Sequence, residues 1–141
     1  MALVGGAGNV AGSNPAGVGT SLNIIGDHAY CYSGNIGANT TAVEAMKFTT
    51  GSYNFVGTFQ FNMAIQDANG TATSQSLAQI EFNGLSISHL TAGMITTDSQ
   101  VTCQQELIIP AYTDVVVKLY STETQADRFI TATLTGRITN A

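Results

Sequence analysis

Charged side chains are scarce in this chain: four Lys or Arg and nine Asp or Glu make up 9% of its 141 residues. Ordinary globular domains carry about 25%. In this chain the polar residues are mostly uncharged: Thr, Ser, Asn and Gln together fill 47 of the 141 positions. Two interpretations are open. Either the chain is rich in strands, which Thr suits, or other subunits cover much of its surface, because interface cores are depleted of charge.

Clustered cations are missing as well. The net charge is −5, and the four scattered cations are Lys47, Lys118, Arg128 and Arg137. Nucleic-acid binding requires several clustered Lys or Arg residues against the phosphates, so we expect no nucleic-acid partner. No run approaches the ~18 apolar residues of a membrane-spanning helix. The first residues lack the basic and apolar regions of a secretory signal. We therefore expect no membrane partner.

Cysteine is limited to Cys31 and Cys103, which form no C-x-x-C pair. Cys103 alternates with Val101, Leu107 and Ile109 on the apolar side of a predicted strand, which predicts a buried free thiol. A disulfide to Cys31 would require the two strands to be neighbours.

What the sequence does contain is alternation. Along Tyr53–Ile65, aromatic, apolar and glycine residues alternate with mostly neutral polar ones, and Val56 is the only clear exception. A period of two over this length excludes an amphipathic helix, which repeats every 3.6 residues. The segment therefore predicts one strand of roughly 43 Å and an all-β class.

Shorter alternating runs and turn signals predict further strands. They lie at Ser21–Ile25, His28–Tyr32, Val43–Phe48, Ser76–Phe82, Leu85–Leu90, Val101–Ile109, Asp114–Tyr120 and Arg128–Ile138. Loops are predicted at residues 34–41 and 121–127. Eight or nine strands, with no helix longer than a turn or two, match an eight- to nine-stranded antiparallel jelly-roll sandwich.

One hairpin carries a specific prediction of register. Asn83-Gly84 suits a type I′ turn, because both positions accept a positive φ. A two-residue loop then predicts three inward-facing pairs: Phe82–Leu85, Ile80–Ile87 and Ala78–His89.

Residues 1–20 differ from the rest of the chain, because they are rich in glycine and uncharged. Such a segment does not nucleate regular structure. It is either a disordered leader or an arm that becomes ordered on a neighbouring subunit. We therefore divide the chain into an N-terminal Gly-rich arm, 1–20, and one domain, 21–141.

Groups for catalysis and metal binding are few. Only His28 and His89 titrate near neutral pH. Asp27 precedes His28, but neighbours in a strand point to opposite faces, so we expect no dyad. We expect His89 to be a packed or interface residue on the apolar side of its hairpin. Residues 67–70 are similar to the opening of a calcium loop, but Ala78 stands where the bidentate Glu belongs. We therefore expect no enzyme, no metal and no cofactor.

Three segments resemble tumour-necrosis-factor and C1q-like jelly rolls. Lys47–Phe55 (KFTTGSYNF) resembles the entry to a core strand, and Leu107–Val117 (LIIPAYTDVVV) resembles the hairpin into the penultimate strand. Thr131–Ile138 (TATLTGRI) resembles the closing strand along the threefold axis. The resemblance covers residues 43–138 and implies a homotrimer. The chain departs from these families in its Thr-rich closing segment and in lacking a Gly-X-Y stalk.

A small, charge-poor jelly roll with a glycine-rich arm is similar to the trimeric decoration (cement) proteins of tailed-phage heads. This likeness implies a structural virion protein on the capsid exterior, made in the host cytoplasm, that binds and stabilises a shell of major capsid protein. The expected shell anchors are Leu3, Val4 and Val10. The expected subunit interface consists of Phe129, Thr131, Thr133 and Thr135.

Two other functions stay open. The chain could be the receptor- or glycan-binding head of a fibre or spike, with sugars stacked on Tyr30, Tyr32 or Tyr112. It could also be a shell-forming jelly-roll capsid subunit.

Overall fold

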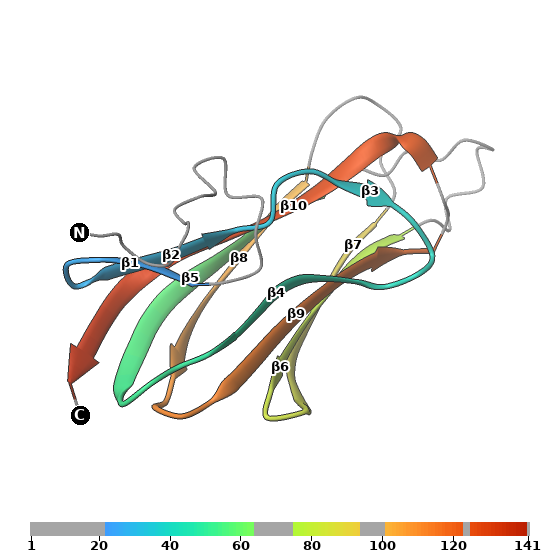
Figure 1. Ribbon diagram of the computed structural model, residues 1–141. Helices are drawn as coiled ribbons and strands as arrows, with labels where there is room; N and C mark the ends of the chain where they lie inside the picture. The colour runs from blue at the N-terminus through green and yellow to red at the C-terminus, as the bar shows by residue number, and fades with distance from the viewer. Residues whose placement is uncertain (1–21, 64–74, 94–100, 123–124, 141) are drawn as a thin grey trace.

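The computed structural model describes residues 22–63, 75–93, 101–122 and 125–140, and these ranges contain strands and no helix (Figure 1). No helix capable of spanning a membrane is therefore found in them. The ten strands are β1 (Asn23–Ile25), β2 (His28–Tyr32), β3 (Ile36–Ala38), β4 (Val43–Thr49), β5 (Tyr53–Met63), β6 (Gln75–Phe82), β7 (Leu85–Gly93), β8 (Val101–Ile109), β9 (Asp114–Ser121) and β10 (Gln125–Asn140).

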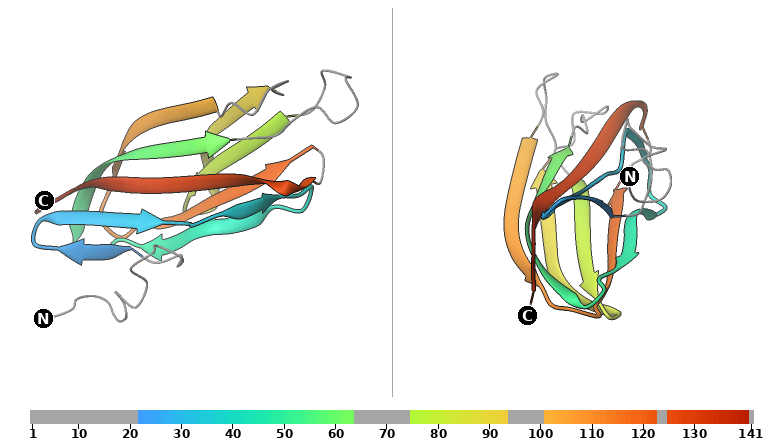
Figure 2. Two further views of the ribbon diagram at one scale, coloured as in Figure 1. Left: turned by 90° about the horizontal axis from the view of Figure 1, so that it is seen from above. Right: turned by 60° about the vertical axis from the view of Figure 1, so that its left-hand side comes forward.

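The strands form two antiparallel sheets, which lie one over the other (Figure 2). The six-stranded sheet has the order β1-β2-β10-β5-β8, and β3 pairs with β10 beside this path. The four-stranded sheet has the order β4-β9-β6-β7. Most connections carry the chain from one sheet to the other, so each sheet combines strands that are far apart in sequence.

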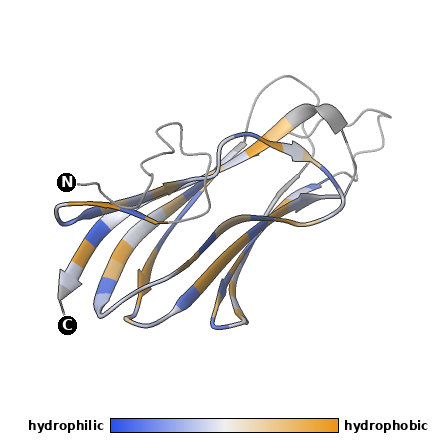
Figure 3. Ribbon diagram, viewed as in Figure 1, coloured by the Kyte–Doolittle hydropathy of each residue, from blue (hydrophilic) through white to orange (hydrophobic). Residues whose placement is uncertain are grey.

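The longest pairing joins β5 and β10 at the middle of the six-stranded sheet. It runs without a break from Ile130 opposite Met63 to Asn140 opposite Tyr53. The predicted long strand is thus confirmed over Tyr53–Met63, and its last two predicted residues, 64 and 65, lie outside the described residues. Figure 3 shows the alternation of apolar and polar residues along these strands.

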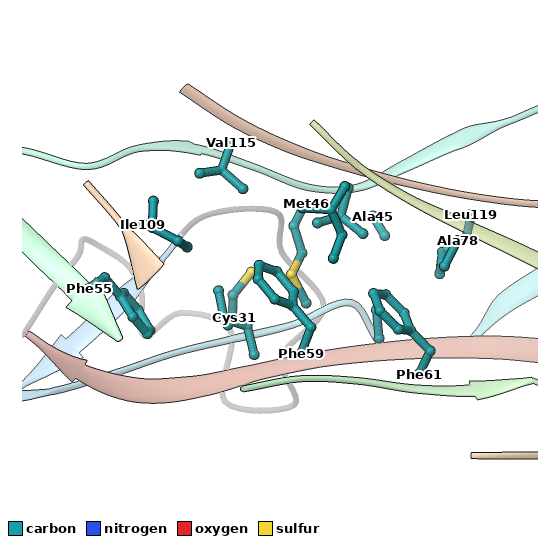
Figure 4. Close-up of a cluster of buried hydrophobic side chains, with 14 of the residues drawn as sticks. Cys31, Ala45, Met46, Phe55, Phe59, Phe61, Ala78, Ile109, Val115 and Leu119 are labelled. Atoms are coloured by element: carbon teal, nitrogen blue, oxygen red, sulfur yellow. The ribbon is translucent and has the colours of Figure 1, made fainter. Parts of the chain in front are cut away.

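The core fills the space between the sheets. From the six-stranded sheet, Phe55, Phe59 and Phe61 point inward and are fully buried, and the rings of Phe59 and Phe61 are nearly parallel (Figure 4). From the four-stranded sheet they meet Met46 and Leu119, among other buried side chains. Burying side chains of this size stabilises a fold by about 1.5–3 kcal/mol each. Alternation along the strands places these apolar residues in one layer.

Two boundaries predicted from the sequence are wrong. The predicted loop at residues 34–41 contains β3, and the predicted loop at 121–127 gives way to β10 from Gln125 onward. The described residues therefore contain ten strands, and the expectation of eight or nine is wrong. Both segments pair with each other across a register shift between Gln125 and Phe129. Neither is long or apolar enough to show alternation, so only the pairing reveals them.

The predicted hairpin register is right at the turn and wrong beyond it. Phe82 faces Leu85, but the pairing then shifts, so that Ile80 faces Ser88 instead of Ile87. Ile87 is the extra residue of a β-bulge, which places two residues on one strand opposite one on the other. As a result Ile87 stays 45% exposed, and Leu90 instead of His89 faces Ala78.

Candidate functional surface

Neutral polar side chains cover much of the outer face of the six-stranded sheet. Because the inward residues of β10 and β5 are buried, the residues between them point outward. Their partners on β2 and β8 extend the same surface. We call this surface the neutral face. It comprises Tyr30, Tyr32, Thr58, Gln60, Asn62, Thr102, Gln104, Thr131, Thr133 and Thr135.

Hydrogen bonds between strands order one part of the neutral face. Asn62 lies between two threonines: its Nδ2 donates to Thr131 Oγ1 at 3.3 Å, and its Oδ1 accepts from Thr102 Oγ1 at 2.9 Å. In the next row, Gln104 Nε2 donates to Gln60 Oε1 at 2.9 Å. Side chains held in this way lose less conformational freedom when a partner covers them.

Two tyrosines border the neutral face on β2. Tyr30 and Tyr32 are half-buried, and their ring centroids lie 5.0 Å apart at a tilt of 41°. In register, Tyr30 lies opposite Thr135 and Tyr32 opposite Thr133. The rings therefore add apolar area to a face that is otherwise made of hydroxyl and amide groups.

Among the residues that the structure describes, the charges near the neutral face lie at its margins. Glu106 is exposed on β8, opposite Thr58. At the turn between β1 and β2, Asp27 lies 2.8 Å from His28 Nδ1 and 3.8 Å from Arg137 Nη1. The expectation that Asp27 and His28 would not meet is wrong, because Asp27 belongs to the turn and not to the strand. Asp27, His28 and Arg137 are all exposed to solvent. Ion pairs at such positions contribute little to stability.

The structure brings all four predicted interface residues to one surface. Phe129, Thr131, Thr133 and Thr135 alternate with the buried Ile130, Ala132 and Leu134 along β10. Phe129 is 45% exposed at the upstream end of this row, opposite Gly37 of β3. The predicted shell anchors, Leu3, Val4 and Val10, lie outside the described residues.

His89 is not packed against the core. The bulge at Ile87 turns His89 to the outer face of the four-stranded sheet, opposite Gln79, where it is exposed. Its Nε2 lies 3.1 Å from the hydroxyl of Tyr120. The expectation of an apolar environment for this histidine is therefore wrong.

Cys31 and Cys103 form no disulfide, and their positions exclude one between them in this fold. Strands β10 and β5 lie between β2, which carries Cys31, and β8, which carries Cys103. Three strand spacings amount to about 14 Å, whereas bridged Cα atoms lie within about 7 Å. Cys31 is buried in the same core cluster as Phe59 (Figure 4), and burial raises the pKa of its thiol to about 12. Cys103 is only half-buried, which corrects the prediction of a buried thiol.

A second region lies at the end of the sandwich where three turns meet. The buried Thr50 accepts a hydrogen bond from the backbone N–H of Thr113 at 2.8 Å and donates to the carbonyl of Pro110 at 2.7 Å. The backbone N–H of Tyr112 donates to the carbonyl of Gly51 at 2.9 Å. From the third turn, Asn83 exchanges two hydrogen bonds with the backbone of Asp114. These contacts fix the three turns to one another. We call this region the turn end.

A surface pocket of about 520 Å³ opens beside the turn end. Strands β4 and β9 supply most of its lining, and Glu81 of β6 and Gly84 of the β6–β7 turn complete it. Its polar groups include Thr49 and Asp114, joined by a hydrogen bond of 2.5 Å from the threonine hydroxyl to the carboxylate.

Sequence reasoning found the polar face of β5 and the threonines of β10, but not their neighbours. Alternation within a strand does not reveal which residues of other strands lie beside it. Four segments that are distant in sequence therefore form one row across the sheet that could not be predicted: Tyr32, Thr133, Gln60 and Gln104. The turn end was missed for the same reason. The positive φ of Asn83 was foreseeable from the Asn-Gly turn, whereas that of Tyr112 carried no sequence signal.

No protein-family model matches this chain, and no curated protein matches it in sequence. Among solved structures, the EclA C-terminal domain, a sugar-binding protein, is similar to this chain with a TM-score of 0.39 and 15% sequence identity. The match covers 70% of this chain and 80% of that one. A likeness at this level carries no inference about the function of this chain.

Proposed function

We propose that this protein is a homotrimeric structural protein that decorates a viral capsid. The observation that carries the proposal is the neutral face: a continuous outer sheet surface built from four strands, with its charges at the margins. Specific interfaces are depleted of charge at their centres. Copies of this chain would bury the face against one another.

The order of the strands supports a TNF/C1q-like jelly roll. Eight strands, β2 and β4–β10, divide into two four-stranded sheets in the orders β2-β10-β5-β8 and β4-β9-β6-β7. Consecutive strands alternate between the sheets except at the β6–β7 hairpin. Two interleaved sheets of four strands are the arrangement of a jelly roll. The closing strand, β10, then lies at the centre of the face that trimers of this kind bury.

The four predicted interface residues fit this arrangement. Phe129 supplies an exposed aromatic side chain at one end of the row, and aromatic residues are enriched in interfaces. Thr131, Thr133 and Thr135 supply methyl groups together with hydroxyls, so a partner can pack against them and still form hydrogen bonds. Tyr30 and Tyr32 would enlarge the contact.

Decoration would follow from the trimer and the arm. Residues 1–20 would bind the shell through Leu3, Val4 and Val10, while the trimer stands on the capsid exterior. A protein that binds only the assembled shell stabilises it by mass action. No cofactor enters this mechanism, and the protein would reach the virion from the host cytoplasm.

The trimer is tested by the native mass of the full chain, measured by light scattering. A mass three times that of the chain, 14.6 kDa, supports the proposal. A strict monomer over the accessible concentration range contradicts it. A large closed particle would instead assign the protein as a shell subunit.

Decoration is tested separately with undecorated capsids and a chain lacking residues 1–20. We expect the shortened protein to keep its trimeric mass and to lose binding in a co-sedimentation assay. If it still decorates the capsids fully, the arm does not anchor the protein. If the full chain does not bind, the decoration proposal fails while the trimer stands.

A further inference from the structure

We propose that the turn end binds a short neutral oligosaccharide, which fills the adjacent pocket and stacks on the ring of Tyr112. The site is separate from the neutral face, because β4 and β9 belong to the other sheet. It would therefore stay available in the trimer proposed above.

The pocket has the groups that sugar hydroxyls require. Asp114 accepts the Thr49 hydroxyl on Oδ1, and its carboxylate offers further acceptor sites. Lys47 supplies an ammonium donor whose side chain is 65% exposed. Phe48 and Val116 supply apolar surface. Ligand sites typically combine an apolar lining with a few placed polar groups in about 300–1,000 Å³, and 520 Å³ lies within this range.

The mixture of charges favours an uncharged ligand. Asp114 and Glu81 would repel an anion, whereas Lys47 would repel a cation. Glu81 is already engaged by Lys118 at 3.3 Å and by Gln79 at 3.1 Å. A sugar hydroxyl both donates and accepts, so it can bond to a carboxylate and to an ammonium in the same pocket.

Tyr112 supplies the stacking surface. It is the most exposed large hydrophobic residue in the part of the chain that the structure describes, at 72%, and it adopts a left-handed φ of 55°. Such a conformation is uncommon for a bulky residue and persists only where its surroundings impose it. Here the hydrogen bond to Gly51 and the buried Thr50 hold the turn. The ring is therefore presented to solvent on a fixed support, and its apolar body suits the C–H face of a sugar.

The backbone positions of Tyr112 and of the pocket residue Asp114 are close enough for one short oligosaccharide to reach both. Tyr112 and Asp114 are two residues apart, so their Cα atoms are at most about 7 Å from each other. Because three turns are fixed before binding, little conformational freedom is lost when the ligand docks.

The test is binding of the full chain to a printed array of neutral oligosaccharides built from glucose, galactose, mannose, fucose and N-acetylhexosamines. The strongest array oligosaccharide is then titrated by calorimetry against wild type and variants. Tyr112→Asn removes the ring but tolerates the left-handed backbone. Asp114→Asn removes the charge and keeps the shape. We expect each variant to bind at least about tenfold more weakly, a loss of about 1.4 kcal/mol.

Val43→Asn serves as the control, because it changes an exposed apolar residue at the other end of β4. It should bind like wild type. Circular dichroism and native mass establish that every variant folds and keeps the oligomeric state of wild type. The proposal is overturned if wild type binds no array oligosaccharide, or if Tyr112→Asn and Asp114→Asn bind as tightly as wild type. Neither result bears on the trimer.

Discussion

The ring of Phe55 lies against Gly136 on the inner side of the six-stranded sheet. A Cβ atom placed on Gly136 would come within 2.4 Å of Phe55 Cε1 and within 2.1 Å of the carbonyl oxygen of Val56. Gly136 faces Gly57 across the β5–β10 pair, and a Cβ on Gly57 would meet the same ring at 2.2 Å. The two glycines together make room for the aromatic ring.

Gly136→Ala should therefore destabilise the protein. One added methyl group must displace both the backbone and a buried ring, and overpacking of this kind costs about 1–3 kcal/mol. Urea unfolding followed by circular dichroism measures the change. Gly37→Ala is the matched control, since no atom lies within 4 Å of its added Cβ, and it should change stability by less than about 1 kcal/mol. Equal effects of the two substitutions would contradict the packing found here.

Cys31 should resist thiol reagents in the folded protein, because burial raises its pKa to about 12. The thiolate is the reactive form. Iodoacetamide, followed by mass spectrometry of peptides, should label the half-buried Cys103 first and reach Cys31 only in denaturant. Rapid labelling of Cys31 in the native state would contradict its burial.

The raised pKa of the Cys31 thiol also predicts that the stability of the protein depends on pH. Well below pH 9 the thiol is neutral in both the folded and the unfolded state and has no effect on stability. Between its ordinary pKa of 9.0 and about 12, the unfolded chain releases a proton that the folded chain keeps, so stability falls as pH rises. Cys31→Ala should show a shallower fall over this window when urea midpoints are compared. Parallel curves for the two proteins would exclude the effect.

Thr50→Val should loosen the turn end. The substitution keeps the shape of the side chain but leaves the buried N–H of Thr113 without the Thr50 hydroxyl as its acceptor. An unsatisfied buried group costs about 1–3 kcal/mol, and amide hydrogen exchange at Thr113 should accelerate. Thr91→Val, at an exposed position of β7 in the other sheet, should stay within about 0.5 kcal/mol of wild type. Unchanged exchange in Thr50→Val would show that this hydroxyl does not hold the turns.

Thr133→Arg should dissociate the proposed trimer. Thr133 lies in the middle of the neutral face, between Tyr32 and Gln60, and a buried unpaired charge there is strongly unfavourable. In the monomer the arginine can extend into solvent, so the fold should persist. Light scattering should then give about one third of the wild-type mass.

The control for this substitution is Thr91→Arg, an exposed position on β7 in the other sheet. It should keep the wild-type mass. A trimer that survives Thr133→Arg would place the subunit interface elsewhere.

Much of the fold was predictable because alternation is a local property. His28–Tyr32 and Val101–Ile109 match their strands to the residue, and the β4–β5 and β6–β7 turns lie where their Gly-containing segments place them. The β-bulge at Ile87 was not predictable, because both strands are alternating on their own and the slip appears only in their pairing. For the same reason His89 was assigned to the wrong face.

The candidate functional surface was likewise predictable only in part. The sequence by itself determined that the protein is all-β, poor in charge, and neutral polar on one side of its longest strands, because these properties follow from residue types and a period of two. Only the tertiary structure decided which strands are neighbours. Backbone pairing brings Tyr32, Thr133, Gln60 and Gln104 into one row, and it fixes Tyr112 on a turn held by Thr50. These are contacts between distant segments, and no local pattern encodes them.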